Sequence, residues 1–213
     1  MVGMISRTSP VAPGVGLPWL TTARWATAFA QIGAGLMATL VLDVSVRWWI
    51  VGLVVAVTLA SNVWWASRGS ARGPGRLDLP AGLILVDVVG LAVVLLAAGG
   101  PLNPVSIYFL VLITQAAFVH GARIAALAAV VATVAYGTLF VSTAPELRAA
   151  MAMHPEVAQH FQGMFWAFAG TAALVTVFVT RLATAVAERD RDVRALEARL
   201  AESASLARLA TLA

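Results

Sequence analysis

The sequence predicts an all-α membrane protein, a six-transmembrane helix bundle followed by a C-terminal cytoplasmic coiled-coil helix. Hydrophobic residues make up 61% of its 213 residues and charged residues only 11%, with a mean hydropathy of +0.89. Soluble domains are about 45–50% apolar and about 25% charged. The apolar residues form long runs separated by short polar breaks, and the length allows about six spans of roughly 20 residues each. No large soluble domain fits beside them.

The six apolar runs are expected to cross a bacterial inner membrane with both termini in the cytoplasm. The net charge of +4 could suggest a nucleic-acid partner. The placement of the arginines indicates membrane orientation instead, because basic residues accumulate in cytoplasmic loops. The cytoplasmic side carries Arg7, Arg24, Arg68, Arg72, Arg76, Arg123 and Arg181, and the other side carries Arg47 and Arg148. The expected spans are Thr22 to Val41, Trp48 to Ala66, Leu79 to Ala98, Ser106 to Val119, Ile124 to Thr143 and Gly163 to Ala183.

Beyond the sixth span the pattern changes from uniformly apolar to a heptad. A 4-3 alternation of seam positions with Glu and Arg between them is typical of a coiled coil, so this segment is expected to pair in parallel with a second copy of the chain. The seam weakens at Ser203 to Ser205 and resumes at Leu206, which predicts a second helical element just before the sequence stops. The seam consists of Leu182, Val186, Arg189, Val193, Leu196, Leu200 and Ser203.

A tight outer-face connection, Gly99 to Val105, joins the third and fourth spans. Gly99 and Gly100 allow positive φ angles, while Pro104 restricts Asn103 and begins the next helix. The expected result is an open Asn103 amide and free backbone N–H groups beside apolar span ends. These groups suit a carbonyl of a lipophilic ligand, but a plain turn between two helices has the same sequence requirements. The residues alone therefore allow either a ligand site or a simple turn between two helices.

Asp87 lies inside the third apolar run. A carboxylate at that depth is paired, protonated or functional. It either lies near the path of a ligand or makes an interhelical hydrogen bond to Gln115, Asn62 or Thr114.

The last outer loop contains His154, Glu156 and His160. The two histidines lack the i, i+4 spacing that places both rings on one helical face, so no metal site is predicted. His160 remains a candidate to assist a ligand oxygen, because histidine titrates near neutral pH. Nor does the sequence contain a phosphate-binding glycine loop, a nucleophile with its base or paired catalytic carboxylates, so this chain alone is not expected to be an enzyme.

The outer loop resembles the GGxxNPF signature of the RegB/PrrB-type redox-sensing histidine kinases. Gly99, Gly100, Asn103 and Pro104 match, and Val105 stands where the family has Phe. The resemblance extends over nearly the whole chain, and the tail from Leu206 is similar to the segment that precedes the family's phospho-accepting His motif. Further matching residues are Arg24, Trp25, Gln31, Asp87, His160, Gly163, Met164, Trp166 and Phe168.

The resemblance implies a sensor that binds ubiquinone or menaquinone from the quinone pool. The chain has no Cys, so only the quinone mode of redox sensing is available to it. Asp87, His160 and Trp166 are implied neighbours of the quinone. The implied quinone site itself is Gly99, Gly100, Asn103, Pro104 and Val105.

The resemblance also implies three parts. Residues 1–21 form a cytoplasmic N-terminal segment, residues 22–183 the transmembrane sensor domain, and residues 184–213 a signalling helix. That helix leads to a missing dimerisation and phosphotransfer domain of an ATP-dependent protein histidine kinase, which acts on a response regulator. Two alternatives remain from the residues themselves: a small six-span transporter or channel, favoured by Asp87, and a structural membrane subunit that dimerises.

Overall fold

The computed structural model describes residues 16–69, 81–142, 148–149 and 152–210, and the regular secondary structure of this part of the chain is entirely helical. Six long helices follow the order of the six apolar runs, which confirms the all-α prediction. Arg7, Arg72 and Arg76, predicted to be cytoplasmic, lie outside the described residues. The elements are α1 (Gly16–Leu40), α2 (Trp48–Gly69), α3 (Ala81–Ala97), the 3-10 helices η1 (Gly100–Leu102) and η2 (Pro104–Ile107), α4 (Tyr108–His120), α5 (Ala122–Val141) and α7 (Pro155–Ala210).

Several of these helices are apolar and long enough to span a membrane. Trp48–Trp65 of α2, Ala122–Val141 of α5 and a stretch of α7 meet this condition by length and composition, while α3 and α4 with η2 are shorter apolar helices. Large apolar side chains are exposed along the bundle, among them Phe29 (69%) and Val134 (62%). Soluble proteins rarely expose such extended apolar surface, whereas it suits a hydrocarbon environment.

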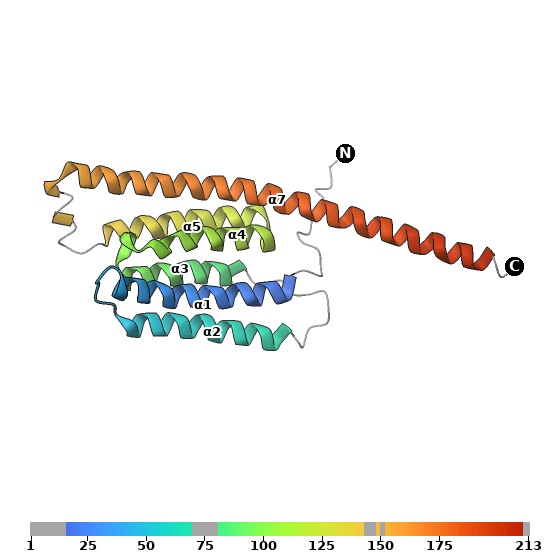
Figure 1. The fold of residues 1–213 in the computed structure, drawn as a ribbon, viewed down its shortest axis with the longest axis horizontal. Coiled ribbons are helices and arrows are strands. Elements are labelled where there is room, and N and C mark those ends of the chain that lie inside the picture. The colour runs from blue at the N-terminus through green and yellow to red at the C-terminus, as the bar shows by residue number, and fades with distance from the viewer. Residues whose placement is uncertain (1–15, 70–80, 143–147, 150–151, 211–213) are drawn as a thin grey trace, which may run out of the picture.

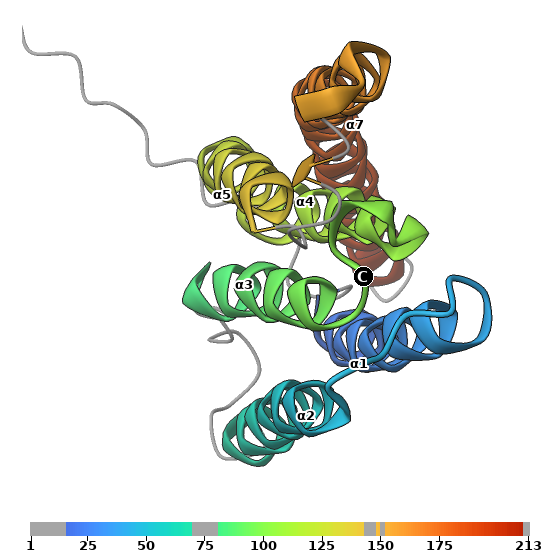
Figure 2. The ribbon, with the colours of Figure 1, turned by 90° about the vertical axis from the view of Figure 1, so that its left-hand side faces the viewer.

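The helices lie side by side in successive layers, as the two ribbon views show (Figure 1, Figure 2). α2 packs against α1 and α3; α3 packs against α4 and α5; α7 packs against α4 and α5. α5 packs closely against α3, α4 and α7 on one face, where three small residues, Ala125, Ala128 and Ala132, are fully buried and allow close approach of the neighbouring helices. One end of the bundle carries the connections 41–47 and 98–107 and the start of α7; we call it the loop end.

α7 is a single helix of 56 residues, about 84 Å long at 1.5 Å per residue. It begins at the loop end, runs along the bundle and projects far past its opposite end (Figure 1). The prediction of a new helical element after Ser203 to Ser205 is wrong, because the helix continues without interruption to Ala210. Serine weakens a hydrophobic seam but is tolerated in helical backbone, and the Ser203 hydroxyl donates to the Leu200 carbonyl at 2.9 Å.

The predicted seam lies on the surface of α7. Its apolar members are 46% to 68% exposed, and so no other helix of the described chain covers them. They are Leu182, Val186, Val193, Leu196 and Leu200.

Candidate functional site

The connection between α3 and α4 adopts the backbone conformation that the sequence predicts. Gly99 and Gly100 have φ angles of 100° and 64°, a region that L side chains rarely adopt. Pro104 is the first residue of η2, and Asn103 is its N-cap in an extended conformation. The two glycines reverse the chain, and Asn103 and Pro104 start it into the next helix.

Asn103 is fully buried, and its side chain is bonded on both sides. Its Nδ2 donates to the carbonyl oxygens of Ala34, at 2.9 Å, and Ala98, at 2.7 Å. Its Oδ1 accepts from the Val105 backbone N–H at 3.0 Å. The expectation of an open amide at the surface is therefore wrong: the close packing of α1 against the loop draws the amide inward, where it satisfies three backbone groups.

The exposed surface of the loop is apolar. Leu102 is 50% exposed and Ile107, the last residue of η2, is 68% exposed, while Pro101 is buried. Val105 is partly buried and packs against the hydrophobic core. A ligand that contacts this loop from outside would therefore meet hydrocarbon groups first.

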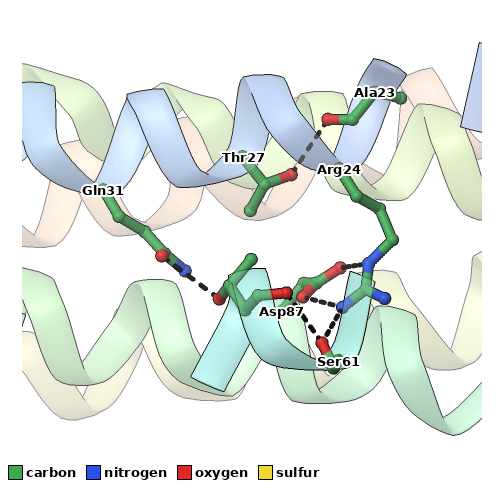
Figure 3. Close-up of polar contacts among 7 residues, drawn as sticks. Ala23, Arg24, Thr27, Gln31, Ser61 and Asp87 are labelled. Atoms are coloured by element: carbon green, nitrogen blue, oxygen red, sulfur yellow. Dashed lines mark hydrogen bonds and ion pairs between the residues drawn. The ribbon is translucent and has the colours of Figure 1, made fainter. Parts of the chain in front are cut away.

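A buried ion pair lies deeper in the bundle, between α1 and α3 (Figure 3). Arg24 Nε and Nη2 donate to Asp87 Oδ2 and Oδ1, both at 2.9 Å. Nη2 also donates to Ser61 Oγ of α2 at 2.8 Å. Both charged side chains are almost completely buried, at 2% and 1% exposure. This fork-to-fork geometry is the strong form of a charge-assisted contact, and it joins three helices.

Two sequence expectations are corrected by this pair. Asp87 bonds to Arg24 and not to Gln115, Asn62 or Thr114. Arg24 is not a flanking charge on the cytoplasmic side, because it lies within α1 and faces the interior. One basic and one acidic residue, each inside its own apolar run, are a signal for pairing that the sequence already contains.

The polar contacts follow one face of α1, on which Arg24, Gln31 and Ala34 recur at helical spacing. Gln31 Oε1 accepts from the Thr58 hydroxyl of α2 at 3.2 Å (Figure 3). One turn further towards the loop end, the Ala34 carbonyl accepts from Asn103. α1 is thus bonded to α3 and α2 at the level of Arg24, to α2 at the level of Gln31 and to the loop at the level of Ala34.

The structure places the three implied neighbours of the quinone in different surroundings. Asp87 precedes Gly99 by twelve residues, which is about 18 Å along a helix. Trp166 is 64% exposed on α7. His160 is also exposed, and its ring packs edge-on against Phe161 at 6.2 Å.

His154 and Glu156 form an exposed contact at 3.3 Å. Within the described residues, no group of three or more His, Asp or Glu side chains is placed to hold a metal ion.

Comparison with protein-family models, curated proteins and solved structures finds no match to this chain. The main structural features of the described chain are the loop with its apolar surface, the buried Arg24–Asp87 ion pair and the projecting helix α7.

Proposed function

We propose that this chain is the membrane sensor module of a two-component histidine kinase of the RegB/PrrB type, which binds quinone at the outer-face loop Gly99 to Val105. The shape of α7 carries the proposal, because one unbroken helix begins at the loop end and projects beyond the opposite end. A rigid helix of this kind can carry a displacement from one membrane face to a kinase core on the other. The identity of the ligand, a quinone, is inferred from the resemblance to this family.

In this proposal all six long helices cross the inner membrane and both termini are cytoplasmic. The ligand is ubiquinone or menaquinone with its tail in the bilayer. Asn103 stabilises the conformation of the loop and does not bind the quinone directly, since its amide is already hydrogen-bonded. The quinone ring lies against the exposed side chains of Leu102 and of the adjoining Ile107 in η2. A transporter is less well supported, because Asp87 is paired with Arg24 and is not a free carboxylate.

Titration with a short-tailed ubiquinone tests the ligand. The protein in nanodiscs is expected to bind it saturably at one site per chain and to release any co-purified quinone. Ile107→Ala is expected to weaken binding about tenfold, which corresponds to about 1.4 kcal/mol, because it removes apolar contact area. Leu174→Ala is the control, since Leu174 is equally exposed, at 69%, but lies in the middle of α7. Absence of saturable binding in folded protein would refute the quinone proposal.

The proposal also includes a parallel homodimer through the seam of α7. The chain has no Cys, so single cysteines report on it without interference. Val193→Cys is expected to form an intermolecular disulfide rapidly under mild oxidation, because equivalent seam positions face each other in a parallel pair. Ala195→Cys, which lies off the seam, should cross-link slowly. Equal rates at the two positions, measured on non-reducing gels, would argue against this seam.

A further inference from the structure

The outer loop and the projecting helix share two neighbours. η1 packs against α3 and α5, and η2 packs against α1, α3 and α4. α7 packs against α4 and α5. A displacement of the loop can therefore reach α7 through side chains of α4 and α5.

Phe168 of α7 contacts both of these neighbouring helices, α4 and α5. Its ring contacts Phe109 of α4 with centroids 6.0 Å apart and an interplanar angle of 76°. It also contacts Tyr136 of α5 with centroids 4.3 Å apart and an angle of 32°. Phe109 is fully buried and Tyr136 is 4% exposed, so neither ring can move without moving its neighbours.

Both partner rings are tied to the loop. Phe109 is the second residue of α4, which continues directly from η2. Tyr136 is a residue of α5, against which η1 packs. A shift of η1 and η2 would therefore push on α5 and α4, the two helices whose rings hold Phe168.

Neighbouring rings fix the same end of α7. Phe140 of α5 stacks edge-on against Tyr136 at 5.1 Å and against Phe161 of α7 at 5.6 Å. Phe161 and Phe168 are seven residues apart, which places them on the same face of the helix. The first turns of α7 are thus held by aromatic contacts, while its far end projects free of the bundle.

We propose that Phe168 is the positioning residue that couples the outer loop to α7: when η1 and η2 move, Tyr136 and Phe109 displace Phe168 and with it the whole helix. This inference rests on the proposed function for its natural trigger, the quinone. The coupling itself depends only on the ring contacts and can be tested without a ligand.

The test uses the full chain in nanodiscs with two spin labels, at Ala126→Cys on α5 and Ala185→Cys on α7. Both positions are exposed, and the natural sequence has no Cys. Short-tailed ubiquinone is expected to shift the distance distribution between the labels. In Phe168→Leu the quinone should bind with unchanged Kd, but the shift should fall to less than a third. Phe178→Leu, the same change at a ring that is 67% exposed on α7, should keep the full shift.

A second trigger separates the two proposals. Gly100→Ala forces a side chain into the left-handed region at φ 64°, and so deforms the loop without any ligand. It is expected to shift the label distance, and Phe168→Leu should abolish that shift as well. If quinone does not bind but Gly100→Ala acts through Phe168, the quinone proposal fails and the coupling stands.

The coupling is overturned if folded Phe168→Leu protein shows the full shift in label distance. It is also overturned if, with Phe168 in place, neither quinone nor Gly100→Ala shifts that distance. Should Phe168→Leu fail to fold, Phe168→Met replaces it, because methionine fills irregular space without an aromatic face. The same loss of shift is expected from Phe168→Met, and a retained shift overturns the proposal equally.

Discussion

Replacing Asp87 with leucine is expected to lower the free energy of unfolding by about 3–5 kcal/mol, because it leaves the Arg24 guanidinium buried without its counter-charge. Arg24 is 2% exposed and makes two hydrogen bonds to the carboxylate. Only the contact with Ser61 would remain among those that the structure gives it. Unfolding by SDS in mixed micelles, followed by circular dichroism, measures the loss.

The double variant Arg24→Leu with Asp87→Leu distinguishes a buried unpaired charge from general damage at this position. Removal of both charges is expected to restore stability to within about 1 kcal/mol of the wild type, since apolar replacement of a buried pair is often neutral or stabilising. Glu156→Leu is the matched control, because Glu156 is a 73% exposed acid; its effect should stay within about 0.5 kcal/mol. An unstable double variant would show that the pair itself is required for the fold.

Asn103→Ala is expected to cost about 2–4 kcal/mol, because three backbone groups lose their partner in a buried place. These groups are the carbonyls of Ala34 and Ala98 and the N–H of Val105. The loss should appear in the same SDS titration. Loss of quinone binding in this variant would therefore not identify Asn103 as a ligand contact.

Asn103→Asp tests the direction of these hydrogen bonds. The carboxylate can still accept from Val105, but it faces two carbonyl oxygens to which it has no proton to donate. It should destabilise the protein at least as much as Asn103→Ala at neutral pH. Gln159→Ala is the control, as an exposed amide at the same end of the bundle, and should change stability by less than about 0.5 kcal/mol. A silent Asn103→Asp variant would contradict the hydrogen-bond assignment.

The sequence by itself determined the helices and the turn. Six apolar runs gave the order of the long helices and approximate bounds for the first five, because the length of an apolar run and its polar breaks are local properties. The sixth helix, α7, begins at Pro155, before the predicted span, and so includes Glu156 and His160. The conformation at Gly99 and Gly100 was equally predictable, since a tight reversal before Asn-Pro requires residues that accept positive φ. The all-α class follows from the same kind of local evidence.

Only the tertiary structure decided which polar groups meet. Arg24 and Asp87 are 63 residues apart, and Asn103 and Ala34 are 69 apart. Their contacts depend on how α1 is rotated and how closely it packs against α3 and the loop. The spacing within each helix fixes a face but not the neighbour of that face. For this reason the sequence placed Arg24 at the membrane surface and the Asn103 amide in the open, whereas packing turned both towards the interior.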